Sequence, residues 1–427
     1  MFLSLLLKLQ KNKFILLLLI GSFIPSLKAQ NTVSISDYLR AVKDSNQFKL
    51  DAKNVSSLND YHYNSPLLKS VQFRTESRDL LLKRQEYALR IKPNSLEAIS
   101  RQKKMYTDRI SEYEIETQLS FNEDLEKRYL LLIEYIFTDK SIDLFEEKQL
   151  QLRDKLTILS KNVYHTNFDV KDLIDAEDEL LETNLKLINL KEKKLNQQAL
   201  INELLNAENE SFKIITDDFI TAQQIIETNL SDTNSNENLV ISLQKLKLNN
   251  LENEMKMEVA ESKLVLDYVQ AKYGGKRSFL FDENFSIGIG INIPFFGEAR
   301  QKKGDFYYEK LSEESKIALL TQKNSLNRRF AVSSFKLAIT NYQTLAKQNE
   351  ESSVTSLLKN YQSMEGVSPL LLLNLKMLQH KKKIEIYKFE HELYKAYIKF
   401  LIGRDVLFQK PLLNYLSTNF EPLNLSD

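Results

Sequence analysis

Apolar and polar residues alternate along one short stretch of the chain, residues 285–293, which leads into a proline, two aromatic residues and a glycine. Successive side chains of a strand point to opposite faces, so the alternation predicts a β-strand with one apolar face. The apolar positions are Phe285, Ile287, Ile289, Ile291 and Ile293. A tilted strand of about nine residues can cross a bilayer. The strand is either lipid-facing with a watery opposite face, or the buried edge of an ordinary sheet.

A weaker alternation lies earlier in the chain, at 71–75 and 87–91. Its apolar positions are Val71, Phe73, Tyr87, Leu89 and Ile91. The residues that alternate with them are mostly charged: Gln72, Arg74, Glu76, Ala88, Arg90 and Lys92. The two segments predict a β-hairpin over 69–93 with one apolar and one charged face. The strand at Phe285 pairs in the same way with the segment from Val265 to Tyr273, which predicts a second hairpin over 265–294.

Most of the remaining sequence has a helical period. Residues 95–163 contain no proline or glycine, and apolar residues recur there every three or four positions. Only nine glycines and seven prolines occur in 427 residues, which favours long helices. Apolar spacing sustained over such a length is typical of a coiled coil. The pattern breaks near Thr166 and resumes after Asp169, a good helix cap, so it predicts a helical hairpin with a tight tip.

The same order of elements returns about 200 positions later. The signal-like segment 1–30 precedes a first repeat, 31–206, made of a helix, the hairpin 69–93, a long helix 95–163, a tip 164–169 and a return helix 170–206. A polar equatorial linker, 207–238, leads to a second repeat, 239–404, made of a helix, the hairpin 265–294, a long helix 298–364, a tip 365–369 and a return helix 370–402, before a C-terminal tail, 405–427. Two copies of one plan predict a mainly α chain with a small β part.

The first thirty residues have the features of a secretory signal peptide. Lys8, Lys11 and Lys13 precede an apolar run over 14–24, and a proline and small residues follow it. The run is too short to cross a membrane as a helix. We expect cleavage after Ala29 or Gln30. No cysteine follows the run, which argues against a lipid anchor at the mature N-terminus.

Composition removes several classes of function. The absence of cysteine excludes disulfides and thiolate chemistry, and a net charge of +1 with abundant charges of both signs argues against a nucleic-acid binder. The histidines lie on separate segments without metal-ligand spacing: His62, His165, His380 and His391. No nucleophile elbow, phosphate loop or paired carboxylates are recognisable. We therefore expect no enzyme activity, no bound metal and no cofactor.

The two hairpins supply only four strands, and the smallest closed barrels have about eight. An open sheet edge cannot lie in lipid because its backbone groups would be unpaired. If the hairpins enter a membrane, several chains must share one barrel. They would then also share a ring of long helices, so an exported chain of this kind predicts a conduit from the outer membrane into the periplasm.

This layout and several of its motifs resemble the TolC-like outer-membrane factors, the outer-membrane efflux protein family of Gram-negative efflux and secretion systems. The resemblance covers about residues 34–408. Its most specific part is the alternating strand that ends in Pro294-Phe295-Phe296-Gly297 and precedes a charged helix. The segments 172–177, after the first tip, and 361–373, around the second, are less specific.

The resemblance implies a homotrimer in which two long helical hairpins per chain build a periplasmic α-barrel and two β-hairpins per chain contribute four strands to a shared membrane β-barrel. It implies a place in the cell outer membrane, in contact with outer-membrane lipid, with a large periplasmic part. The implied function is the outer-membrane channel subunit of a tripartite efflux or type I export system. Its partners would be a periplasmic adaptor (membrane fusion) protein and, indirectly, an inner-membrane pump.

The helical tips are the expected adaptor-docking sites, although ordinary turn chemistry would explain the same residues. They are Thr166, Asn167, Phe168 and Asp169 in the first repeat, and Glu365, Gly366, Val367 and Ser368 in the second. The expected elbow between strand and helix lies at the membrane boundary, with ordinary core packing as the alternative. Its residues are Pro93, Pro294, Phe295, Phe296 and Gly297.

The charged face of the first hairpin and the polar face of the second are candidates to line a pore. The residues are Arg74, Glu76, Arg90, Lys92 and Asn292, and a merely solvated face is the alternative. A different class of function also fits part of the pattern. A secreted or periplasmic coiled-coil scaffold without channel activity would use the strands only for packing, but it gives no reason for a repeat that includes both hairpins.

Overall fold

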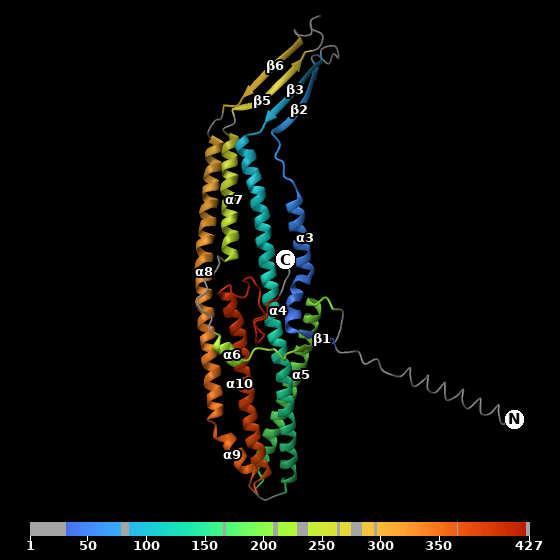
Figure 1. Cartoon of the computed structure of the whole chain (residues 1–427), viewed down its shortest axis with the longest axis vertical. Helices are drawn as coiled ribbons and strands as arrows, with labels where there is room; N and C mark the ends of the chain where they lie inside the picture. The colour runs from blue at the N-terminus through green and yellow to red at the C-terminus, as the bar shows by residue number, and fades with distance from the viewer. Residues whose placement is uncertain are drawn as a thin grey trace, which may run out of the picture.

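The computed structural model describes residues 31–77, 85–164, 168–207, 212–228, 238–262, 265–274, 284–293, 297–364 and 366–423. The molecule is elongated, with long helices along its axis and a small sheet at one end (Figure 1). The helical tips lie at the other end. The predicted signal peptide, 1–30, lies outside the described residues.

The chain is mainly α with a small β part, which confirms the predicted fold class. In chain order the elements are β1 (Asn31–Ser34), α2 (Ile35–Arg40), the 3-10 helix η1 (Ala41–Asp44), α3 (Asn46–Asp60), β2 (Leu68–Ser77), β3 (Gln85–Pro93), α4 (Leu96–Lys161), α5 (Val170–Leu204), β4 (Phe212–Ile215), α6 (Ala222–Glu227), α7 (Leu239–Ser262), β5 (Leu266–Tyr273), β6 (Phe285–Ile291), α8 (Gly297–Glu350), α9 (Ser353–Gln362) and α10 (Pro369–Gly403).

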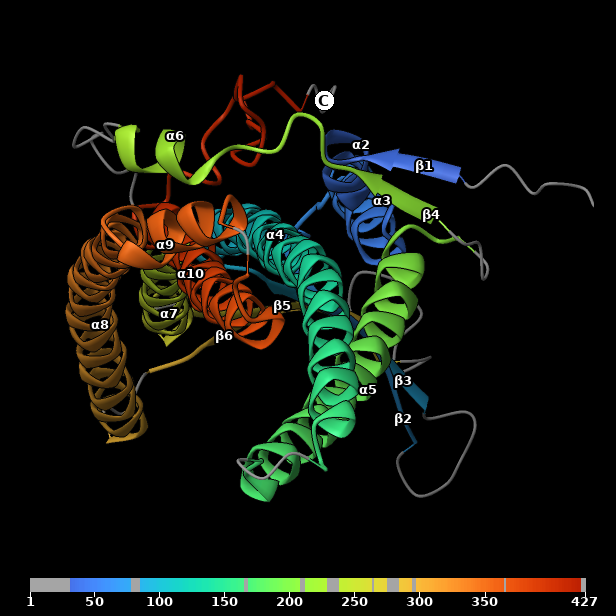
Figure 2. The ribbon, with the colours of Figure 1, turned by 90° about the horizontal axis from the view of Figure 1, so that it is seen from below.

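The helices form a curved row, with α8 at one end and α5 at the other (Figure 2). The central helix α4 packs against α3 and α7 on the side of the sheet and against α5 and α10 toward the tips. Helix α8 packs against α7 and α10 only at its inner side. Among the described elements the row therefore has two free edges, one along α3 and α5 and one along α8.

Local capping accounts for where the long helices begin. The Ser95 side chain accepts a hydrogen bond from the Ala98 amide (3.4 Å) at the start of α4, and the Asp169 side chain accepts one from the Lys171 amide (2.9 Å) at the start of α5. Each cap pairs a backbone donor that has no partner inside the helix. Pro369 occupies the first turn of α10, where its missing N–H costs nothing.

The main hydrophobic core lies midway along the molecule, where α2 and the middle of α4 meet the end of α10. The predicted linker and tail both contribute to it. Ile220 and Ile225 from the linker and Leu416 and Leu423 from the tail are buried there. The Ile220 amide donates to the Leu416 carbonyl (2.9 Å), which joins the two segments. The sequence did not reveal this packing, because the polar composition of the linker indicates a loop.

Arg128 is a fully buried cation inside this core. Its guanidinium donates to the carbonyls of Tyr38 (3.0 Å) and Leu204 (2.7 Å) and lies 3.6 Å from the Asp124 carboxylate. Burial is the main cause that lowers its pKa. These contacts tie α4 to α2 and to the end of α5, since a buried charge needs partners of this kind.

Two predicted helices are interrupted. The helix expected before the hairpin 69–93 in the first repeat is divided by Ser45, whose side chain caps α3. The long helix predicted over 298–364 was wrong as a single element, because α8 ends at Glu350 and α9 begins at Ser353. The Ser352 side chain accepts from the Val354 amide (3.3 Å) and from Lys382 of α10. Serine offers the backbone a bond that competes with the helix.

The sheet contains four strands in the order β2-β3-β5-β6, with antiparallel pairing throughout. Each pair of neighbours in sequence is one predicted hairpin, and β3 joins β5 across the two repeats. Strands β2 and β6 are the edges of this sheet. They lie above the two free edges of the helical row (Figure 1), so the sheet and the helices end on the same sides. A separate parallel pair joins β1 to β4.

Candidate functional site

One face of the four-stranded sheet is apolar and uncovered. The pairing aligns rows of apolar residues across all four strands: Phe73, Leu89, Ala271 and Ile287 in one row, and Val71, Ile91, Val269 and Ile289 in the next. Ile287 is 70% exposed, and Ile289, Ile291 and Ile293 are each more than half exposed. Among the described residues no helix covers this face, so within them the strand is not the buried edge of an ordinary sheet.

The opposite face is polar and is held by contacts between strands. Arg90 of β3 donates two hydrogen bonds to the Gln270 side chain of β5 (3.0 and 2.8 Å). Lys272 forms an ion pair with Glu86 across the same two strands. Lys92 and Asp267 form another, at 3.1 Å. The two repeats are therefore joined by polar side chains as well as by the backbone.

The predicted pore-lining residues all lie on or next to this polar face. Arg74 and Glu76 stand on β2, Arg90 and Lys92 on β3, and Asn292 just beyond β6. The Arg90 guanidinium lies 3.8 Å from the centre of the Tyr268 ring. That ring in turn covers Gly290, where an added Cβ would come within 2.2 Å of it. The sequence gives no sign of this three-layer stack, because its members are far apart in the chain.

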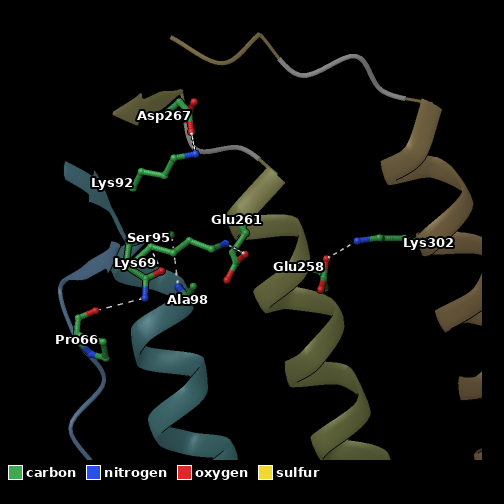
Figure 3. Close-up of polar contacts among 10 residues, drawn as sticks. Pro66, Lys69, Lys92, Ser95, Ala98, Glu258, Glu261, Asp267 and Lys302 are labelled. Carbon is green, nitrogen blue, oxygen red and sulfur yellow. Dashed lines mark hydrogen bonds and ion pairs between the residues drawn. The ribbon is translucent and has the colours of Figure 1, made fainter. Parts of the chain in front are cut away.

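The junction between sheet and helices is held by charged pairs from several elements (Figure 3). Lys69 of β2 contacts Glu261 of α7 (2.7 Å), and Lys302 of α8 contacts Glu258 of α7 (3.1 Å). The Asn94 side chain donates to the Pro66 carbonyl (3.4 Å) just above the Ser95 cap. These bonds fix the direction in which α4 and α7 leave the sheet.

The predicted elbow residues lie at this junction as far as the structure describes them. Pro93 is the last residue of β3 and is paired with Leu68, and Gly297 is the first residue of α8. Pro294, Phe295 and Phe296 lie outside the described residues. For these three residues the elbow at the membrane boundary therefore remains a prediction.

The predicted tip residues are only partly described. Asp169 caps α5 with its side chain, and Phe168 beside it is half-buried. Gly366 has a φ of 84°, a backbone conformation that favours glycine, and Val367 and Ser368 lead from it into α10. Thr166, Asn167 and Glu365 lie outside the described residues. Turn chemistry accounts for Asp169 and Gly366, and the adaptor contact stays a prediction.

The two edges of the helical row carry exposed apolar stripes that the sequence analysis missed. On α5, Ile174, Leu181, Ile188 and Leu195 recur every seven residues and are each more than half exposed. On α8 the stripe consists of Leu319, Leu326, Phe330 and Leu337, also each more than half exposed. Seven-residue spacing of this kind is the pattern of a coiled-coil seam. The seven-residue spacing is visible in the sequence. The sequence does not show which side of each helix is left uncovered by the neighbouring helices.

A charged cluster joins three helices between the core and the tips. The Glu134 carboxylate of α4 lies 3.2 Å from Nε2 of His391 on α10 and 2.5 Å from Nζ of Lys193 on α5. These contacts, that of His391 first, hold the pKa of Glu134 well below its usual range. Nearby on α10, burial raises the pKa of Glu390. The pKa values of these two carboxyl groups are thus shifted in opposite directions, because Glu134 gains cationic partners whereas Glu390 loses water.

Among the residues that the structure describes, no helix is long and apolar enough to span a membrane. In the same part of the chain, no group of three or more histidine, cysteine or acidic side chains is arranged to hold a metal ion. The polar face of the sheet, the junction, the tips and the helical edges are therefore the surfaces on which a function can be argued.

No protein-family model matches the sequence, and no curated protein matches it at a significant level. Solved structures match most of its length. The CmeC outer membrane channel of Campylobacter jejuni has a TM-score of 0.63 at 11% identity, covering 88% of this chain and 86% of CmeC. The open state of the MtrE outer membrane channel of Neisseria gonorrhoeae has a TM-score of 0.63 at 10% identity, covering 87% and 89%.

A membrane protein from Pseudomonas aeruginosa matches with a TM-score of 0.62 at 12% identity, over 86% of this chain and 93% of that protein. Identity at this level shows shared architecture and leaves activity open. The curved row of long helices, the sheet of two joined hairpins and the length over which they match lead to one conclusion: this chain has the fold of the TolC-like outer-membrane factors.

Proposed function

We propose that this chain is the outer-membrane channel subunit of a tripartite efflux or type I export system, and that three copies form a conduit from the periplasm to the exterior. The observation that carries the proposal is the sheet: its apolar face is uncovered on one side, its other face is polar, and both of its edges are free. The uncovered apolar face and the free edges would both be costly in a monomer in water, whereas the polar face would not, and a shared membrane barrel uses all three features.

The edges of the sheet require neighbours. In lipid, the backbone groups of β2 and β6 must pair, because no water is present to bond them. Four strands are too few to close on themselves. Pairing β6 of one copy with β2 of the next continues the sheet with the apolar face outward and the polar face toward a water-filled lumen.

The helical edges support the same arrangement. Helix α8, which carries one stripe, lies on the side of β6, and helix α5, which carries the other, lies on the side of β2 (Figures 1 and 2). A neighbour that extends the sheet therefore also brings its α5 stripe toward the α8 stripe. The contact joins the α5 surface of one copy to the α8 surface of the next, so it is a head-to-tail contact. Head-to-tail contacts build a closed ring when successive rotations between copies add up to a full turn. The number of three rests on the resemblance to outer-membrane factors.

The inner surface of the barrel would be polar and nearly balanced in charge. Lys92 with Asp267 and Lys272 with Glu86 neutralise one another across strands β3 and β5. Arg74, Glu76 and Arg90 complete this surface, and Asn292 stands at its end nearest the helices. Charges at such positions tune which ions pass. A conduit of this kind has no chemistry of its own, so the partner pump supplies the energy.

The tips at the far end are the proposed docking site for a periplasmic adaptor. Tyr164 beside the first tip is 96% exposed, and Met364 beside the second is also exposed. Exposed aromatic and methionine side chains are enriched where proteins bind one another. The tip residues from Thr166 to Asp169 and from Glu365 to Ser368 belong to the same proposed surface.

The alternative, a coiled-coil scaffold without channel activity, would need the apolar face of the sheet to be covered. The described residues leave that face open, which favours the channel. A scaffold would also remain in the soluble fraction, so cell fractionation separates the two proposals.

Cross-linking tests the ring directly because the chain contains no cysteine. Leu195 of α5 and Leu337 of α8 lie at similar heights above their tips and belong to the two stripes. The double variant Leu195→Cys/Leu337→Cys, oxidised in isolated outer membranes, should give covalent dimers and trimers. Either single variant, and the pair Leu195→Cys/Leu311→Cys with its cysteines at different heights, should remain monomeric. A monomer in the periplasmic fraction would refute the channel.

A further inference from the structure

The same tetrapeptide, Arg-Gln-Lys-Lys, occurs twice in the chain, at 101–104 and at 300–303. The first copy lies within the first turns of α4, and the second lies within the first turns of α8. Both helices begin at the junction with the sheet (Figure 1). The two repeats therefore place an identical cationic segment at the same level of the molecule.

Within the part of the chain that the structure describes, most of these cations form no ion pair. Lys103, Lys104, Arg300 and Lys303 are exposed, and within the described residues none of them forms an ion pair. The other two basic residues of the motif have partners: Arg101 lies 3.8 Å from Glu97, and Lys302 lies 3.1 Å from Glu258. Each copy of the motif thus contributes two cations that are unpaired among the described residues.

The acidic residues of α7, the helix between α4 and α8, are largely occupied elsewhere. Glu261 pairs with Lys69 (2.7 Å), and Glu252 pairs with Lys310 (2.8 Å). Glu254 and Asp305 are exposed acids in the neighbouring turns, and they are fewer than the four unpaired cations. The surface just below the junction therefore keeps positive charge available for a partner.

The side chains next to the sheet are apolar and exposed. Leu67, Leu96 and Ile293 are exposed at the junction, below the uncovered apolar face. From Leu96 to Lys103 the helix descends about 10 Å at 1.5 Å per residue. Lysine and arginine side chains can extend several ångströms upward from such a position. The order of apolar face, exposed leucines and cations matches the order of hydrocarbon and phosphate in a bilayer leaflet.

We propose that the two Arg-Gln-Lys-Lys segments form a cationic collar that binds the phosphates of anionic glycerophospholipids in the membrane leaflet nearest the helices. This inference rests on the proposed membrane location of the sheet. The cations stand on two helices separated by α7, so they form a band and do not converge on one pocket. A band suits a lipid surface, whereas a free phosphate ion needs donors that converge.

The test uses the mature full-length protein, purified from outer membranes in neutral detergent, with thermal unfolding as the readout. Dioctanoyl-phosphatidylglycerol is titrated at low salt, and dioctanoyl-phosphatidylcholine serves as the uncharged lipid. The collar variant is Lys103→Gln/Lys104→Gln/Arg300→Gln/Lys303→Gln. The matched control, Lys161→Gln/Lys171→Gln/Lys376→Gln/Lys381→Gln, removes exposed lysines near the tips.

We expect phosphatidylglycerol to stabilise the wild type and the control more than phosphatidylcholine does, and high salt to remove the difference. The collar variant should bind phosphatidylglycerol at least about tenfold more weakly. If the collar variant fails to fold, the charge-preserving variant Lys103→Arg/Lys104→Arg/Lys303→Arg should keep the wild-type preference.

Equal stabilisation of the wild type by the two lipids would overturn the proposed collar. A loss of phosphatidylglycerol binding in the control variant as large as in the collar variant would overturn it as well. Stabilisation by inorganic phosphate alone to the same extent would also overturn it, in favour of a free-ion site. The cross-linked trimer is measured in the same preparation. A trimer that shows no lipid preference would refute the collar and remain consistent with the channel. A soluble monomer would refute both proposals.

Discussion

The two long helices, α4 and α8, begin the same way below the sheet, but their surroundings differ. Helix α4 has neighbours on both sides, and its middle buries a continuous series of side chains: Phe121, Leu125, Tyr129, Leu132, Ile133, Ile136 and Phe137. On α8, Phe335 is the buried residue that the structure describes. The same plan thus produces one helix at the centre of the layer and one at its edge.

This difference indicates which surfaces belong to the chain and which to an assembly. The apolar side chains of α4 are covered by α2, α5 and α10, so they stabilise the fold of a single copy. The stripe on α8 has no cover within the described residues, and α8 lies on the same side of the molecule as the edge strand β6 (Figure 1). We therefore expect substitutions in α4 to affect folding, and substitutions on the outer side of α8 to affect assembly.

The largest expected effect is at Arg128, on the central helix. Arg128→Met would leave the carbonyls of Tyr38 and Leu204 without their donor inside the core. We expect a loss of roughly 3–5 kcal/mol, since removing one partner of a buried charge network is costly. Thermal unfolding of the purified protein measures it. The exposed Arg329 of α8 is the matched control, and an Arg329→Met effect of equal size would contradict the comparison.

A leucine pair tests the same contrast without charge. Leu132 of α4 is fully buried, whereas Leu326 of α8 is 55% exposed. Leu132→Ala should lower the free energy of unfolding by about 2–5 kcal/mol because it leaves a cavity. Leu326→Ala should leave unfolding nearly unchanged and lower the trimer fraction in light scattering. If instead Leu326→Ala unfolds the chain and spares the trimer, α8 does not form the seam.

The carboxylates between the core and the tips predict opposite pH effects. The pKa of Glu134 is lowered in the fold, so its stabilisation is present above its ordinary pKa of 4.5 and is lost as the pH falls below that value. The pKa of Glu390 is raised, so its charged form opposes folding at neutral pH. At pH 7, Glu134→Gln should lower the unfolding temperature and Glu390→Gln should raise it. The Glu390 difference should shrink near pH 4, whereas the Glu134 difference should persist there and shrink only at lower pH, as Glu134 itself takes up a proton in the fold. Shifts of the same sign at pH 7 would contradict this assignment.

The smallest expected effect is on the polar face of the sheet. An added Cβ at Gly290 would meet the Tyr268 ring, whereas none of the described atoms lies within 4 Å of one at Gly288. Gly290→Ala should displace the ring and Arg90 with it, at a cost of about 1 kcal/mol, and change the conductance of channels in planar bilayers. Gly288→Ala should leave conductance as it is. Equal conductance in both variants would show that Arg90 does not line the channel.

Much of this fold could be predicted from short-range patterns. Alternation at Phe285–Ile291 and around Phe73 and Leu89 predicted the strands, and the cap residue Asp169 predicted the start of α5. The free apolar face follows from the same alternation, because a period of two places all large side chains on one side. The break at Ser352 was missed, since it depends on a serine that bonds its own backbone and a lysine of α10.

The side-by-side order of the elements and the burial of their faces were decided by contacts between residues far apart in the chain. The burial of Leu416 and Leu423 in the predicted tail, the partners of Arg128 and the stack of Arg90 on Tyr268 each join segments that no local pattern connects. Periodicity fixes which residues share a face, because side-chain direction is set by the backbone of a single element. Which faces are covered depends on the neighbours that packing selects, and so the same periodicity produced a buried α4 and an exposed α8.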